Sequence, residues 1–180
     1  MKKLTLLRHA KSSWDDPVTR DFDRPLNEKG KRAAVVMGKF VNRNAITFDQ
    51  VLASPALRVI ETLEHFEDAS GLAFEPQWDR KIYLASSVTL MDVLRGADPQ
   101  AGHVLMVGHN PGLEDLIFDL VPHENPSEER SAVEIKYPTA SLAELTLNID
   151  NWTDIKDGCA TFNRFTRPRD LDPELGPDHI

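Results

Sequence analysis

Residues 3–12 read KLTLLRHAKS, and this stretch decides how the rest of the chain is interpreted. The segment KLTLL at residues 3–7 is short and mostly apolar, which predicts a buried strand. Arg8 and His9 follow it directly. Because ligands of open α/β sheets bind at the carboxyl ends of the strands, a cation and an imidazole are expected at a binding edge.

Strand-like and helix-like segments alternate along the rest of the chain. Apolar runs predict strands at residues 49–53 and 103–107 and a shorter one at 74–78. Apolar side chains at helical spacing predict helices over about 28–42, 55–71, 88–94 and 111–120. Alternation predicts two late strands at 132–137 and 141–149, joined as a hairpin around Pro138. The order predicts an α/β fold, a three-layer sandwich with a largely parallel central sheet flanked by helices.

Capping residues and prolines mark where these elements begin and end. Asn27 is expected to cap the first helix. Ser54–Pro55 and Asn110–Pro111 each place a capping residue before a proline, which is typical of a helix start. Residues 10–26 and 122–131 are polar and are expected to be loops. We therefore expect residues 1–180 to form a single domain in which about 167–180, rich in proline and acid, are a loosely ordered tail.

Composition excludes several classes of protein. The net charge of -8 argues against a nucleic-acid binder, although a local basic pocket is compatible with it. No apolar run approaches the roughly 20 residues that a membrane span needs, so no membrane partner is expected. Cys159 is the single cysteine and is interpreted as a small buried hydrophobe, which favours a reducing, cytoplasmic location.

Two further residues join Arg8 and His9 at the expected binding edge. Arg58 falls in the first turn of the helix after strand 49–53, and His109 directly follows strand 103–107. A histidine after a strand is usually structural, and an arginine in the first turn opposes the helix dipole. Convergence of four such residues from three segments indicates an anion site, and a phosphoryl group suits it best because guanidinium groups match its oxygens.

Four segments resemble the motifs of a known family. LLRHAKS at residues 6–12 is similar to the Arg-His-Gly signature of the histidine phosphatase superfamily, its phosphoglycerate mutase-like branch. RPLNEKGKRAA, ASPALRVIET and VGHNPG resemble its further motifs, in the right order, and the match spans at least residues 4–116. The short chain, without long inserts over the site, is most similar to the SixA-type phosphohistidine phosphatases.

The resemblance implies a role for each residue of the site. His9 would attack phosphorus and become phosphohistidine, which water then hydrolyses. Arg8, Arg58 and His109 would bind the nonbridging oxygens and stabilise the transition state. No cofactor is expected, and no metal, since His103 and His109 do not have a zinc-ligand spacing. Lys11 and Asn110 are candidate substrate-binding residues, with a solvated lysine and a helix N-cap as the alternatives.

The chain departs from the family pattern at two positions. Ala10 stands where the family usually has glycine, a change that leaves His9 in place. Many members also carry a carboxylate that protonates the leaving group, but the matching stretch RKIYLAS at residues 80–86 has none. Tyr83 or Leu84 falls near that position, and Asp79 is the nearest carboxylate before it.

The missing acid bears on the substrate. An alkoxide leaving group needs a proton as its bond breaks, whereas the imidazole of phosphohistidine accepts one near neutral pH. We therefore expect the substrate to be a histidine-phosphorylated protein domain, its identity and the oligomeric state being left open. The alternatives are a phosphomonoesterase for sugar or nucleotide phosphates with Asp79 as its acid, and a noncatalytic phosphate-binding module.

Overall fold

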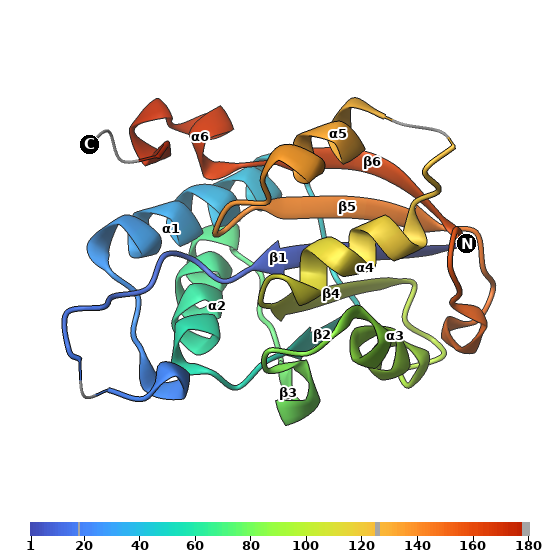
Figure 1. Ribbon diagram of the computed structural model, residues 1–180, viewed down its shortest axis with the longest axis horizontal. Coiled ribbons are helices and arrows are strands. Elements are labelled where there is room, and N and C mark those ends of the chain that lie inside the picture. Colours follow the sequence, from blue (N-terminus) through green and yellow to red (C-terminus); the bar gives the residue numbers. More distant parts are fainter. Residues whose placement is uncertain (18, 125–126, 178–180) are drawn as a thin grey trace.

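One six-stranded sheet runs through the computed structural model, which describes residues 1–17, 19–124 and 127–177 (Figure 1). Its strand order is β3-β2-β4-β1-β5-β6. The strands are β1 (Lys2–Arg8), β2 (Gln50–Ala53), β3 (Gln77–Trp78), β4 (His103–Gly108), β5 (Leu142–Leu147) and β6 (Ala160–Thr166). Strands β1 to β4 are parallel, and β5 is antiparallel to both of its neighbours. The largely parallel sheet confirms the predicted α/β class.

The pairing of β1 with β4 positions the site. Arg8 lies opposite Gly108 in this parallel pair, and the backbone N–H of His9 donates to the Gly108 carbonyl at 3.0 Å. Because the two strands end in register, the residues that follow them, His9 and His109, leave the sheet side by side. Their ring centroids are 5.3 Å apart.

Helices cover both faces of the sheet and close two apolar cores. Helices α1 (Glu28–Arg43) and α2 (Leu57–Ser70) pack on one face through residues such as Met37 and Phe66. Helices α3 (Ser87–Arg95), α4 (Gly112–Leu120) and α5 (Glu128–Ile135) pack on the other, where Leu116 and Val133 are buried. The result is the predicted three-layer sandwich. No helix among the described residues is long and apolar enough to span a membrane.

The late part of the chain differs from the prediction. Residues 132–137 were expected as a strand, but most of them belong to α5. The Ser127 hydroxyl accepts from the Arg130 N–H and caps this helix, and Arg130 and Val133 are buried one turn apart. The antiparallel hairpin is formed by β5 and β6 instead, and β6 was missed although its burial alternates along the strand.

The expected loosely ordered tail is a structured segment as far as residue 177. It forms α6 (Pro168–Leu171) and a 3₁₀ turn, η4 (Pro173–Leu175). Leu175 is buried against the core under α1, and Arg32 of that helix pairs with Asp172 and Glu174. These contacts stabilise a segment whose composition is typical of a tail. Residues 178–180 of the expected tail lie outside the described residues.

Candidate active site

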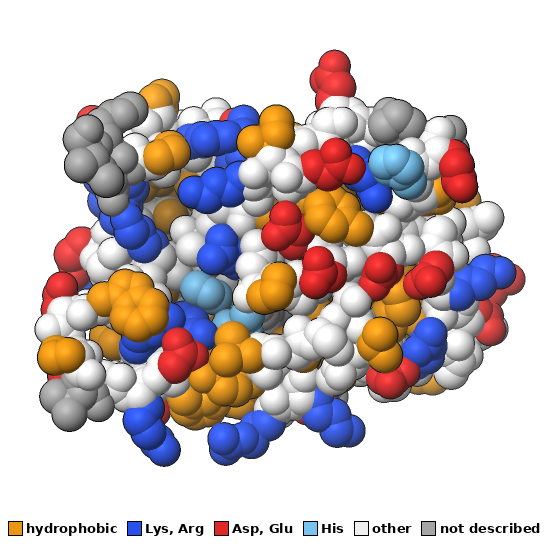
Figure 2. All heavy atoms as spheres, viewed as in Figure 1, with side chains coloured by type: hydrophobic (Ala, Val, Ile, Leu, Met, Phe, Trp, Pro, Cys, Tyr) orange, Lys and Arg blue, Asp and Glu red, His pale blue; other side chains and the backbone are white. Residues whose placement is uncertain are grey.

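A pocket of about 420 Å³ opens at the carboxyl ends of β1 and β4 and contains all four residues of the predicted anion site. Its cationic side chains are Arg8, Lys11, Arg24 and Arg58. Asp21 is the one carboxylate among the described residues that line it. Figure 2 shows histidine side chains in a hollow bordered by Lys and Arg side chains. We call this cavity, which His9 and His109 share, the histidine pocket.

His9 is held as a neutral imidazole with one nitrogen free to react. Its side chain lies in the pocket wall and the residue is only 7% exposed. Nδ1 lies 2.7 Å from the Ala10 carbonyl oxygen, which only accepts, so Nδ1 carries the proton and Nε2 has the lone pair. Burial, followed by the nearby His109 and Arg8, lowers the pKa of His9 to about 3, against the Ala10 hydrogen bond that raises it.

The loop after His9 is fixed by the neighbouring helices. The Ala10 N–H donates to Thr62 Oγ1 of α2 at 2.9 Å. The Asn27 N–H, at the start of α1, donates to the Lys11 carbonyl at 3.0 Å. A Cβ at Gly30 would fall on that same carbonyl oxygen, so only glycine lets α1 approach the loop this closely. The glycine of the RPLNEKG motif is thereby explained by packing next to His9.

Arg8 is anchored by Tyr137, which lies between α5 and β5. Its Nη1 donates to the Tyr137 carbonyl at 2.8 Å, and the hydroxyl of buried Tyr137 donates to the Leu6 carbonyl at 2.8 Å. Burial lowers the pKa of Arg8, and the positive charge of the nearby Arg58 lowers it further. The guanidinium is therefore fixed in orientation and lies in a surrounding that favours an anion beside it.

Arg58 is only 2% exposed and is positioned by Asp21. Its two terminal nitrogens donate to the Asp21 carbonyl at 2.7 Å and to Asp21 Oδ2 at 3.0 Å. Asp21 also accepts from Tyr83 and Arg24. Burial raises the pKa of Asp21, but these hydrogen bonds outweigh it and lower the pKa to about 2. Asp21 is thus ionised and cannot supply a proton near neutral pH.

His109 is oriented by Arg58 and Ser54. Arg58 can only donate, so the 3.3 Å contact makes His109 Nδ1 the acceptor, and Nε2–H then donates to Ser54 Oγ at 2.7 Å. Burial first, and Arg58 second, lower the pKa of His109 to about 3. The prediction that Ser54 caps α2 was wrong, because α2 begins at Leu57 with Ala56 at its N-cap.

Asn110 and Lys11, the two candidate binding residues, also line the histidine pocket. Asn110 does not cap a helix, since α4 begins at Gly112 after Pro111 and has no side-chain cap. Its Nδ2 donates to the Tyr137 carbonyl at 3.1 Å, the same oxygen that Arg8 uses. Tyr137 thereby links the end of β1 with the loop that follows β4.

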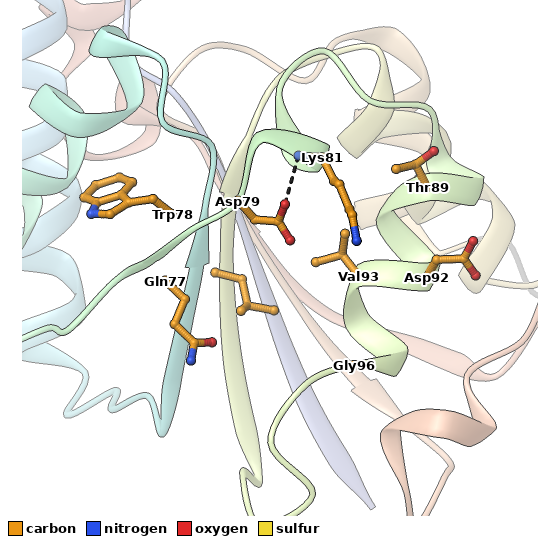
Figure 3. Close-up of a pocket in the computed structure, with 9 residues that line it drawn as sticks. Gln77, Trp78, Asp79, Lys81, Thr89, Asp92, Val93 and Gly96 are labelled. Carbon is orange, nitrogen blue, oxygen red and sulfur yellow. Dashed lines mark hydrogen bonds between the residues drawn. The ribbon is translucent and has the colours of Figure 1, made fainter.

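The structure separates Asp79 from the site. Asp79 lines a different cavity, of about 530 Å³, beside β3 and α3, together with Trp78 and Lys81 (Figure 3). Its carboxylate accepts from the Lys81 N–H at 2.9 Å and caps the 3₁₀ turn η2 (Arg80–Ile82). Tyr83 lies against the His109 ring, but its hydroxyl donates to Asp21, and burial raises its pKa. Neither residue fits the role of proton donor.

Sequence reasoning missed the residues that hold the catalytic candidates in place. Arg24 lies in the RPLNEKG motif and Thr62 in ASPALRVIET, so the motifs contained a signal for both. Asp21 is in a polar loop, in the turn η1 (Asp21–Asp23), and nothing in its neighbourhood indicated that Arg58 would depend on it.

The fold and the pocket together define an α/β protein with a cation-lined pocket built around two histidines. The model of the histidine phosphatase superfamily (branch 1) matches residues 4–80. An uncharacterised protein of Mycobacterium tuberculosis, Rv1276c, is 30% identical over 164 residues, which cover 91% of this chain and all of that protein. The chain belongs to the histidine phosphatase superfamily.

Two comparisons connect the chain with SixA proteins. The phosphohistidine phosphatase SixA of Escherichia coli is 26% identical over 168 residues, covering 92% of this chain and 94% of SixA. The structure of an Agrobacterium tumefaciens protein assigned as phosphohistidine phosphatase SixA superposes with a TM-score of 0.78 at 27% identity, covering 93% of this chain and 98% of that one. Family and neighbours support phosphatase activity for this chain.

Proposed function

We propose that this protein hydrolyses phosphohistidine on a protein substrate, with His9 as the nucleophile and without a metal. The observation that carries the proposal is the state of His9. It presents an unprotonated Nε2 in a pocket whose described lining residues include four cationic side chains and no carboxylate able to donate a proton. Such a site favours a phosphoryl group on a leaving group that needs little acid catalysis.

The geometry supports a two-step reaction. In the first step His9 Nε2 bonds to phosphorus as the bond from phosphorus to the substrate imidazole breaks. The substrate ring, protonated by solvent on its other nitrogen near neutral pH, keeps the bonding electron pair and leaves as neutral imidazole. In the second step water attacks the phosphohistidine, which releases inorganic phosphate and restores His9. Arg8 and Arg58 are placed to hold the nonbridging oxygens, and their hydrogen bonds to Tyr137 and Asp21 fix them beforehand.

His109 changes its role when a phosphoryl group is present. In the unliganded site its pKa is lowered by burial and by Arg58. A phosphoryl dianion acts in the opposite direction and favours the imidazolium, which donates to a nonbridging oxygen. Lys11 and Asn110 line the pocket and are proposed as further phosphoryl contacts.

The alternatives are weakened by two observations. A phosphomonoesterase that uses Asp79 needs this carboxylate at the phosphoryl site, but Asp79 lines another cavity and caps η2. A noncatalytic phosphate-binding module needs the cations but has no use for a desolvated, tautomer-fixed His9. We further propose that the whole chain acts as one domain in the cytoplasm, which agrees with the free, buried thiol of Cys159.

The proposal is tested by comparing substrates and by trapping the intermediate. We expect kcat/KM to be higher for a phosphohistidine protein domain than for phosphoserine peptides or sugar phosphates, by about 10²–10⁴, the value of a positioned acid. Wild type should form an acid-labile phosphoenzyme, His9→Ala should form none, and His123→Ala, a change at an exposed histidine outside the pocket, should match wild type. Full turnover by His9→Ala, or loss of activity on EDTA treatment that added metal restores, would contradict the mechanism.

A further inference from the structure

A second groove opens directly from the histidine pocket. It has a volume of about 330 Å³ and shares three lining residues with the pocket: Arg8, Lys11 and Thr139. From there it continues between α1, the end of α5 and the α6–η4 segment. A group bound in this groove would therefore lie next to a phosphoryl group bound at His9. We call it the basic groove.

The charge of the basic groove is opposite to that of the whole chain. It is lined by five cations from separate segments: Arg8, Lys11, Lys29, Lys136 and Arg169. No acidic side chain is among the described residues that line it, although the chain carries a net charge of -8. Figure 2 shows Lys and Arg side chains gathered toward α6 and α1, while Asp and Glu side chains lie over α4.

The cations at the outer end of the groove are available to a ligand. Lys136 is exposed at the end of α5 and Arg169 is partly exposed on α6. Among the described residues, no side-chain hydrogen bond or salt bridge holds either side chain, although Arg169 is near enough to Asp170 to contribute to the lowered pKa of that carboxyl. Placing like charges around one hollow is unfavourable unless an anion offsets their repulsion.

The part of the histidine pocket's mouth that lies away from the basic groove is apolar. Trp14 is 75% exposed and Leu84 is 56% exposed, and both line the histidine pocket but not the basic groove. Large exposed hydrophobic side chains beside a binding site are typical of surfaces that contact another protein. The inner side of Trp14 covers the Arg24 guanidinium, 3.5 Å from the ring centroid, and the outward exposure of both side chains favours a partner larger than a small phosphorylated molecule.

We propose that the basic groove binds acidic side chains that flank the phosphohistidine of the protein substrate, while Trp14 and Leu84 contact an apolar part of the same partner. This inference rests on the proposed function and adds the chemistry by which the partner is recognised. It makes Lys136 and Arg169 specificity-determining residues, since they lie outside the histidine pocket and act on substrates that carry an acidic flank.

The test uses three phosphohistidine peptides that differ only in the residues flanking the phosphohistidine: glutamate, serine or lysine. Wild type should have a kcat/KM for the acidic peptide about tenfold or more above that for the neutral peptide, within the range reported for electrostatic steering. Lys136→Glu combined with Arg169→Glu should abolish or reverse this preference, measured as the ratio of kcat/KM for the acidic peptide to that for the neutral peptide. Lys136→Ser combined with Arg169→Ala repeats the test with smaller changes in case the first variant does not fold.

The matched control is Lys156→Glu, which makes the same kind of charge change near the end of the sheet where β4 begins, away from the carboxyl ends of the strands. Lys156 is exposed after the 3₁₀ turn η3 (Trp152–Asp154), where Trp152 donates to the Ala101 carbonyl before β4 begins. This variant should keep the wild-type preference. The unfolding midpoints of all variants are measured alongside.

Each outcome separates the two proposals. If wild type hydrolyses aryl phosphate but no phosphohistidine peptide, both the proposed function and the docking proposal are overturned. If wild type hydrolyses all three peptides equally, or if the groove variant keeps the preference, only the docking proposal is overturned. A third outcome is that the three peptides are equivalent, that inorganic triphosphate inhibits wild type far better than phosphate does, and that the groove variant loses this difference. In that case the groove binds a small polyanion and the docking proposal is overturned.

Discussion

Asp21 is the carboxylate on which the cations of the histidine pocket are arranged. It accepts from Arg58, Arg24 and Tyr83, and Arg58 in turn donates to His109. Asp21 is therefore a positioning residue, since an ionised carboxylate would repel a phosphoryl group if it touched it. Its own charge is offset by the two arginines, so the pocket keeps an excess of positive charge.

Replacing this carboxylate should slow the chemical step. Asp21→Asn keeps the size of the side chain but loses the charge-assisted hydrogen bond that Arg58 donates to Oδ2, worth about 1.5–3 kcal/mol, while the bond to the backbone carbonyl remains. We expect kcat to fall on the order of tenfold or more, with a smaller change in KM. The control is Asp23→Asn in the same turn, whose partner is the exposed Arg20. Equal effects of the two changes on kcat would show that Asp21 does not act through Arg58.

The two histidines should leave a signature in the pH dependence of stability. Their pKa values are about 3 in the folded protein and about 6.5 in an unfolded chain. Between these values the unfolded chain binds protons that the folded chain does not, so the free energy of unfolding falls as pH falls from about 6.5 toward 3. Above about pH 6.5 both histidines are neutral in the folded and the unfolded chain, so they no longer lower the free energy of unfolding. The pKa of Asp21, about 2, adds a further loss only below about pH 4.

Two-state urea unfolding at several pH values between about 4.5 and 7.5 measures this dependence. His9→Gln should have a shallower slope than wild type below pH 6.5, by up to about 1.4 kcal/mol per pH unit. His123→Gln, at an exposed position, should keep the wild-type slope. A slope unchanged in His9→Gln would mean that His9 is not kept neutral by its burial.

At the level of elements, the C-terminal segment gives a clear test. Leu175 of η4 is buried in the core that contains residues of α1 and α2, and Lys29 and Arg32 of α1 contact the segment. Leu175→Ala should therefore lower the free energy of unfolding by about 2–5 kcal/mol. Leu171→Ala, at a partly buried position, should have a smaller effect. Thermal or urea unfolding measures both, and no loss of stability in Leu175→Ala would support the loosely ordered tail instead.

The success of the sequence predictions varied with the length and the partners of each element. The strands β1 and β4 are buried on both faces, so their continuous apolar runs were sufficient to predict them as strands. Helix α5 was mistaken for a strand because it is short: residues 122–131, which include its cap Ser127, were interpreted as a polar loop, and residues 132–137 show a brief alternation. Local pattern could not decide such a segment, because its conformation depends on which residues it packs against.

The same distinction applies to the site. Arg8, His9, Arg58 and His109 could be placed together because each ends or follows a strand or lies in the first turn of a helix at one edge of the sheet. The hydrogen bonds of Ser54 and Asn110 could not be predicted, since both have the sequence context of a helix cap and instead contact His109 and Tyr137. Sequence context gives the position of a side chain along an element, whereas its partner across the fold depends on tertiary structure.

At the scale of the whole molecule, the chain combines a net charge of -8 with a basic face around its site. These two charges act differently on an acidic phosphoprotein. The net charge repels it at long range, whereas the basic groove and the histidine pocket attract it at short range. Since the Debye length is about 10 Å at 0.1 M salt, the distant acidic side chains are screened before the contacts at the site are.

The sign of the salt effect decides which charge governs association. If the basic face dominates, raising the salt concentration from about 0.05 to about 0.5 M should lower kcat/KM for the acidic phosphohistidine peptide more than for the neutral one. If the net charge dominates, the same change should raise kcat/KM for the acidic peptide, because screening relieves repulsion. The ratio of the two peptides is the quantity to measure, since it cancels competition between salt anions and the phosphoryl group at Arg8 and Arg58. A ratio that rises with salt would show that long-range repulsion outweighs the groove, and that recognition has to come from the apolar contacts at Trp14 and Leu84.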